Sequence, residues 1–124
     1  MLPVIDEQQF GVAERTMGKR FPAFASLYIR DVQRYVRDIA AGLKAGSADA
    51  IIQPAHTLKL SSRIVGAVQS SYWAEALEHR AKQMREGSTD LNELVTLSHA
   101  MTHCLGEALI EISQRVTVTE KAAS

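Results

Sequence analysis

The fold prediction starts from one stretch, Ala55-His56-Thr57-Leu58-Lys59-Leu60-Ser61-Ser62-Arg63-Ile64-Val65-Gly66-Ala67. At about 100° per residue this stretch forms an amphipathic helix. Together with the residues just before it, its buried face gathers Ile51, Ala55, Leu58, Ser62 and Val65. The opposite face gathers Ile52, His56, Lys59, Leu60 and Arg63. A histidine thus stands beside two cations on an exposed helix face, which suits a nucleophile that takes up a dianionic phosphoryl group.

Apolar residues recur at helical spacing along the rest of the chain and predict five helices and no strand. The expected helices span residues 6–17, 21–44, 48–65, 67–85 and 91–115. Asp6 is placed to cap the first helix, and Pro22 suits the first turn of the second. Gly46 and Ser47 separate the second helix from the third. Pro54 lies inside the third helix, so either the helix bends there or its regular part begins near that residue.

Each long helix has residues at helical spacing along one side. The second helix has Phe24, Tyr28, Val32, Tyr35, Val36, Ile39 and Leu43. The fourth has Trp73, Ala76, Leu77, Arg80 and Met84. The fifth has Leu91, Leu94, Ser98, Met101, Leu105, Ala108 and Ile112, whose alternating steps of three and four make a good heptad seam. We expect Trp73 and the tyrosines in the core or at its edge, and Cys104 as a small buried residue.

Short connections between long amphipathic helices favour antiparallel neighbours. We therefore expect an all-α fold, an antiparallel up-down four-helix bundle with a short accessory N-terminal helix that covers one end. A chain of 124 residues supports a single domain. Its core is expected to run from about residue 6 to 115, with a frayed tail over about 117–124.

Composition excludes several classes of protein. Fourteen basic and fourteen acidic residues cancel, which argues against a nucleic-acid binder. No apolar run approaches the roughly 20 residues of a membrane span, and the N-terminus lacks the features of a signal peptide. The single cysteine makes no internal disulfide. We therefore expect a cytoplasmic protein. We also expect a monomer, because no large apolar face is left unpartnered.

The segment from His56 to Ala67 resembles the signature of histidine-containing phosphotransfer (HPt) domains, roughly His-x-Leu-Lys-Gly-Ser-Ser-x-x-x-Gly-Ala. Every defined position matches except that of Leu60, where the family has glycine. The HPt fold, a four-helix bundle with an accessory N-terminal helix, agrees with the helices predicted above. The resemblance implies that His56 accepts a phosphoryl group from the aspartate of one receiver domain and donates it to another.

The resemblance also implies the partners, a hybrid sensor histidine kinase and a response-regulator receiver domain. The chain has no Gly-rich nucleotide loop, so we expect a phosphocarrier without autokinase activity. The exposed face around His56 offers no cage of carboxylates. We therefore expect no cofactor in this chain and assign Mg²⁺ to the receiver partner.

Glu78 is the candidate to orient the imidazole. In a helical hairpin that turns at Gly66, Glu78 comes level with His56, since the two lie at similar distances from the turn. HPt domains often carry Gln or Glu at this spacing, hydrogen-bonded to the active histidine. The alternative for Glu78 is an ordinary surface pair with Lys82 at i+4. Lys59, one turn after His56, is the expected electrostatic partner of the phosphoryl oxygens.

The expected partner-binding residues are Ile52, Leu60 and Arg63. Leu60 leaves two outcomes open, because residue i+4 lies directly against His56 on the helix surface. The leucine either leans aside and adds apolar docking area, or blocks approach. In the second case the chain is an HPt-like docking module that binds a receiver without efficient transfer.

A second group of polar residues, His99, His103 and Glu107, lies on one stripe of the last helix. Three ligands spread along one straight helix span roughly 12 Å, too far to share a metal ion. We therefore expect a solvated polar face there and no metal site.

Overall fold

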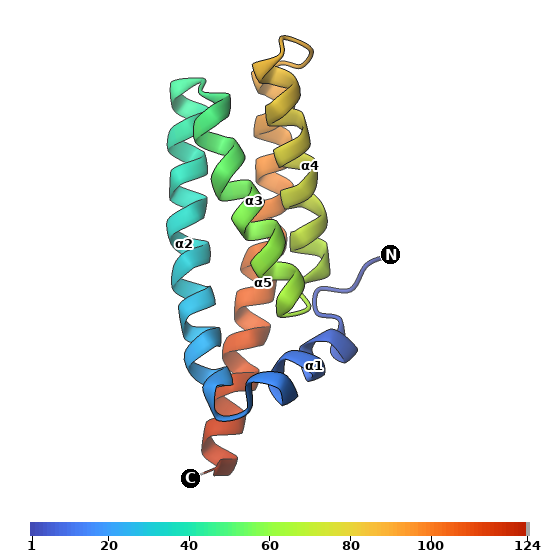
Figure 1. Cartoon of the computed structure of the whole chain (residues 1–124), viewed down its shortest axis with the longest axis vertical. Helices are drawn as coiled ribbons and strands as arrows, with labels where there is room; N and C mark the ends of the chain where they lie inside the picture. Colours follow the sequence, from blue (N-terminus) through green and yellow to red (C-terminus); the bar gives the residue numbers. More distant parts are fainter. Residues whose placement is uncertain (124) are drawn as a thin grey trace.

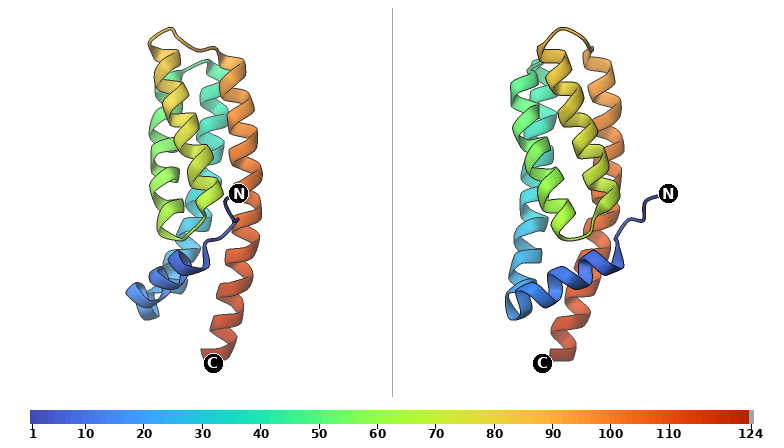
Figure 2. Two further views of the ribbon diagram at one scale, coloured as in Figure 1. Left: turned by 90° about the vertical axis from the view of Figure 1, so that its right-hand side faces the viewer. Right: turned by 45° about the vertical axis from the view of Figure 1, so that its right-hand side comes forward.

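The computed structural model describes the backbone of residues 1–123 and the side chains of residues 1–116. The elements follow in the order α1 (Glu7–Met17), the 3₁₀ turn η1 (Gly18–Arg20), α2 (Phe21–Ala45), α3 (Ala48–Ile64), α4 (Val68–Arg85) and α5 (Leu91–Ala123). Over that range no strand is present. The four long helices run alternately up and down, side by side, and α1 crosses the lower end of the bundle (Figures 1 and 2). The predicted all-α four-helix bundle with an accessory helix is confirmed.

Local sequence explains where the first helices begin. The Asp6 side chain accepts a hydrogen bond of 3.0 Å from the backbone N–H of Gln9, which caps α1 as predicted. The Ser47 side chain accepts a bond of 3.3 Å from the backbone N–H of Ala50 and so caps α3. The 3₁₀ turn between α1 and α2 was not predicted.

Pro54 lies within α3, which is one helix from Ala48 to Ile64. The alternative that the regular helix begins near Pro54 is therefore wrong. The proline removes only the bond to the carbonyl of Ala50 in the preceding turn, and Ala50 is exposed, so water can satisfy that carbonyl.

The last helix is longer than expected. Its backbone remains helical to Ala123, beyond the predicted end at residue 115. The prediction of a frayed tail over about 117–124 is therefore wrong as far as Ala123, and Ser124 lies outside the described residues.

The buried faces of α3 and α5 agree with the prediction. All five residues predicted to be buried on α3 are buried, and so is the seam of α5 apart from Leu91, which is exposed at the start of the helix. Each helix of the bundle packs against two others, with α3 between α2 and α4, and α5 against α2 and α4. The described helices include none with the length and apolar character that a membrane span requires.

The residues predicted to lie along one side of α4 border the core but do not form its buried face, and Trp73 and Met84 pack against the core from the edge. Arg80 is exposed, Trp73 is half-buried, and only Leu77 of the five is fully buried. The residues that α4 buries are Ser70, Ser71, Ala74, Leu77, Glu78 and Ala81. Most of these side chains are small, which lets α4 approach its neighbours closely. The Ser71 hydroxyl donates a bond of 3.0 Å to the Lys59 carbonyl of α3.

The turn between α3 and α4 is fixed by Gly66 and by the segment before α1. Gly66 has a φ of 82°, which favours glycine. Its carbonyl accepts a bond of 2.7 Å from the backbone N–H of Asp6. A Cβ at this position would lie 2.8 Å from the Asp6 carbonyl oxygen, so only glycine fits without a shift. The turn determines which residues of α3 and α4 lie level.

Candidate functional site

His56 projects from the exposed side of α3 toward α4. Its Nδ1 lies 2.7 Å from Oε2 of Glu78, and its side chain is 41% exposed. The hairpin therefore brings the two residues together as predicted. Nε2 of His56 has no hydrogen-bond partner among residues 1–116.

Glu78 presents a largely buried carboxylate, with only 7% of its side chain exposed. Burial alone would raise the pKa of this carboxyl. The hydrogen bonds and positive charges of Lys59 and His56 outweigh burial and hold the pKa below the usual value of 4.5. Glu78 is thus ionised at neutral pH.

The ionised state of Glu78 decides the tautomer of His56. A carboxylate only accepts hydrogen bonds, so Nδ1 must carry the hydrogen in this contact. In a neutral imidazole the lone pair then lies on Nε2, the nitrogen left free. The site presents a pre-oriented nucleophile.

Two lysines compensate the charge of Glu78. Nζ of Lys59 lies 2.7 Å from Oε1, and the Lys59 side chain is only 16% exposed. Nζ of Lys82 lies 3.4 Å from Oε2, the same oxygen that meets His56. The two alternatives for Glu78 are therefore not exclusive, because it contacts both His56 and Lys82. Lys59, expected to face phosphoryl oxygens, is engaged first with Glu78.

The expected partner-binding residues surround His56 to different degrees. Leu60 is 43% exposed one turn beyond the imidazole. Ile52 is only partly exposed and packs against the core. Nη2 of Arg63 lies 3.6 Å from Oε2 of Glu75, with both side chains exposed. Ile64, one turn after Leu60, is 44% exposed and was not predicted, although its i+4 spacing from Leu60 is a readable signal.

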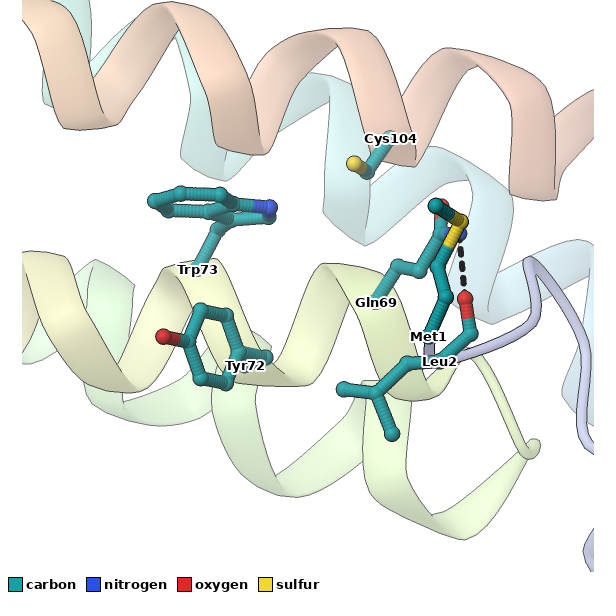
Figure 3. Close-up of a pocket in the computed structure, with 6 residues that line it drawn as sticks. All are labelled: Met1, Leu2, Gln69, Tyr72, Trp73 and Cys104. Atoms are coloured by element: carbon teal, nitrogen blue, oxygen red, sulfur yellow. Dashed lines mark hydrogen bonds between the residues drawn. The ribbon is translucent and has the colours of Figure 1, made fainter.

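An apolar groove of about 390 Å³ lies elsewhere, between the N-terminal segment, α4 and α5 (Figure 3). Its lining residues are Met1, Leu2, Gln69, Tyr72, Trp73 and Cys104. The rings of Tyr72 and Trp73 meet edge to face with centroids 5.1 Å apart. Tyr72 is 54% exposed and is neither in the core cluster nor packed against it, so the prediction that it lies in the core or at its edge is wrong. None of the residues around His56 lines this groove.

In the group formed by His99, His103 and Glu107, one pair of side chains is in contact. Nε2 of His103 lies 2.6 Å from Oε1 of Glu107 on the surface of α5. Within residues 1–116, no three His, Cys, Asp or Glu side chains gather closely enough to hold a metal ion.

Comparisons with known proteins identify the family and the fold. The family model described as "Hpt domain" matches residues 23–118, which include the whole His56 cluster. The crystal structure of histidine-containing phosphotransfer protein B (HptB) from Pseudomonas aeruginosa PAO1 superposes with a TM-score of 0.85 at 23% sequence identity. The match covers 94% of this chain and 97% of that chain. A comparison with curated protein sequences finds no significant match.

Proposed function

We propose that this chain, which belongs to the Hpt domain family, relays a phosphoryl group between receiver-domain aspartates by carrying it on Nε2 of His56. Membership makes it a phosphocarrier of phosphorelays. One observation carries the finer assignment, the 2.7 Å contact between Nδ1 of His56 and the ionised carboxylate of Glu78. That contact leaves Nε2 as the free nitrogen of an exposed imidazole.

The proposed transfer needs no proton to leave the site. Nε2 attacks the phosphorus of a receiver's aspartyl phosphate, the P–O bond breaks, and its electron pair stays on the departing carboxylate. The imidazole keeps its Nδ1–H and becomes positively charged. Glu78 already lies against that hydrogen, so the new charge forms beside a fixed anion. The return transfer to a second receiver reverses these steps.

Lys59 acts in this proposal through two contacts. One N–H donates to Oε1 of Glu78 and fixes the carboxylate from the side away from His56. An ammonium group has three donors, so others remain for phosphoryl oxygens that arrive on the same helix face.

The proposed partners are a response-regulator receiver domain and the receiver of a hybrid sensor histidine kinase. They would dock on the surface that carries Ile52, Leu60 and Arg63, with Ile64 extending its apolar part. Mg²⁺ would belong to the receiver, whose aspartate carries the phosphoryl group. We further propose that the chain has no autokinase activity and obtains its phosphoryl group only from partners.

A second candidate function rests on Leu60. Its exposed side chain stands where the family has glycine, one turn from the attacking nitrogen. If the leucine blocks closure of a receiver over the imidazole, the chain is a docking module that binds receivers without efficient transfer.

Transfer from a phosphorylated receiver domain separates the two functions. The relay predicts an acid-labile label on the wild type and on His99→Gln, which removes another exposed histidine. It predicts no label on His56→Gln, although that variant still binds the receiver. Receivers that bind the wild type but leave no label on it would favour the docking module.

A further inference from the structure

We propose that the carboxylate of Glu78, held between Lys59 and Lys82, sets how long the phosphoryl group stays on His56. This inference rests on the proposed function and adds to it a control of phosphohistidine lifetime. It starts from the number of nitrogen atoms that meet one carboxylate, since side-chain nitrogens of His56, Lys59 and Lys82 all lie within 3.4 Å of Glu78 oxygens.

The chemistry of the phosphohistidine makes Nδ1 the controlling atom. When Nδ1 carries a hydrogen, the P–Nε2 bond breaks with its electron pair on Nε2, and a neutral imidazole departs. The phosphoryl group goes to water or to a carboxylate oxygen. When Nδ1 is bare, the departing group is an imidazolate anion, which is far more basic and leaves slowly. Whatever favours the hydrogen on Nδ1 therefore shortens the lifetime.

Glu78 favours the protonated form because a carboxylate accepts hydrogen bonds and donates none. A bare Nδ1 would face Oε2 at 2.7 Å with two lone pairs opposed. A carboxamide at this position would serve either form, since its oxygen accepts from Nδ1–H and its NH₂ donates to a bare Nδ1. The choice of Glu over Gln thus biases His56 toward rapid donation.

The two lysines weaken the preference of Glu78 for Nδ1–H to different degrees. Lys59 is mostly buried and holds Oε1, whereas Lys82 is half-exposed on α4 and lies against Oε2, which also meets Nδ1. The charge of Lys82 therefore competes directly with the imidazolium for one oxygen. No charged side chain of α1 or α2 makes an ion pair with this cluster in the part of the chain described, and the pair Arg63–Glu75 lies further along the two helices.

Loss of the Glu78 charge and loss of the Lys82 charge should change the phosphohistidine lifetime in opposite directions. Glu78→Gln keeps the shape of the side chain but loses its charge, so the pH at which hydrolysis slows should fall by about one unit. At a pH above that midpoint the phosphohistidine should last about ten-fold longer. Lys82→Met should strengthen the hold of Glu78 on Nδ1–H and shorten the lifetime by about two- to three-fold, a smaller effect because Lys82 is partly solvated.

Phosphoramidate, a small phosphoryl donor that needs no partner protein, loads the histidine for this test. The decay of the ³¹P NMR signal is followed between about pH 5 and pH 9 for wild type, Glu78→Gln and Lys82→Met. Matched controls remove the same charges elsewhere, with Glu86→Gln at the exposed end of α4 and Lys44→Met on α2. Both controls should follow the wild-type profile.

Opposite shifts for Glu78→Gln and Lys82→Met, with unmoved controls, support the inference. If the wild type is phosphorylated and both variants share its decay profile, the inference is overturned and the proposed function is left intact. A profile that shifts equally in the controls also overturns it, since net charge alone would then suffice. A wild type that acquires no signal on His56 overturns the proposed function and this inference together.

Discussion

Gly66→Ala should destabilise the chain by about 2–3 kcal/mol, because the glycine satisfies two constraints at once. A non-glycine residue held at a φ of 82° costs about 1–2 kcal/mol. Alanine recovers about 0.4–1 kcal/mol by restricting the unfolded chain, which leaves a net loss near 1 kcal/mol. The added Cβ would also lie 2.8 Å from the Asp6 carbonyl oxygen and 3.1 Å from the Phe10 nitrogen. Displacing that backbone adds about 1–2 kcal/mol.

Gly87→Ala is the matched control for this prediction. Gly87 has a φ of 85°, nearly the same as that of Gly66, but a Cβ there meets nothing within 4 Å. Thermal unfolding at a fixed pH measures both variants. For a chain of this size 1 kcal/mol corresponds to about 4 °C, so we expect Tm to fall by about 8–12 °C for Gly66→Ala and about 4 °C for Gly87→Ala. Equal losses at the two positions would show that the approach of Asp6 contributes nothing.

Substitutions at Ser62, Glu78 and Leu60 change one buried hydrogen bond, one ionised carboxylate and one exposed apolar side chain. Ser62→Ala should lower the free energy of unfolding in urea by about 1–3 kcal/mol, because the buried Tyr28 hydroxyl loses the hydrogen-bond partner that lies 2.7 Å away. Tyr28→Phe should cost less stability in the Ser62→Ala background than in the wild type. Equal costs in the two backgrounds would show that the two side chains are not coupled. The folded-state pKa of Glu78 is lowered, so its ionised carboxylate stabilises the fold above about pH 4.5, and this stabilisation is lost as the pH falls through the folded-state pKa. The difference in Tm between wild type and Glu78→Gln should therefore shrink as the pH is lowered. A difference in Tm that does not change with pH would contradict this prediction. If the exposed Leu60 side chain contacts the receiver, Leu60→Ala should weaken receiver binding about five-fold, as measured by calorimetry. Unchanged binding with faster phosphoryl transfer would show that the leucine obstructs the receiver's approach to His56.

The parts of the fold that depend on a single local rule could be predicted from the sequence. The apolar face of α3 follows from helical spacing alone, and each of its predicted residues is buried. The contact of His56 with Glu78 follows from counting along two straight helices from a turn at Gly66. The seam of α5 was predicted for the same reason, and Leu91 departs from it only because it begins the helix.

The stripe predicted for α4 was only partly right, because burial there depends on the distance between helices. Spacing of large apolar residues selected Trp73 and Met84, whereas the bundle buries serines and alanines that allow close approach. Glu78 is buried despite its charge, since Lys59 crosses from α3 to neutralise it. The residue pattern of one helix does not show which side chain a neighbouring helix places against it. For this reason the ion pair between Lys59 and Glu78 was not predicted.

We propose that Glu78 holds Nδ1–H of His56 and leaves Nε2 to carry the phosphoryl group. ³¹P NMR of the chain after transfer from a phosphorylated receiver can distinguish the two phosphohistidine isomers, because they differ in chemical shift. We predict one Nε2-phosphohistidine signal that is absent from His56→Gln. A signal from the Nδ1 isomer would show that Glu78 does not reserve Nε2 for phosphorylation, and a signal that survives in His56→Gln would show that His56 is not the acceptor.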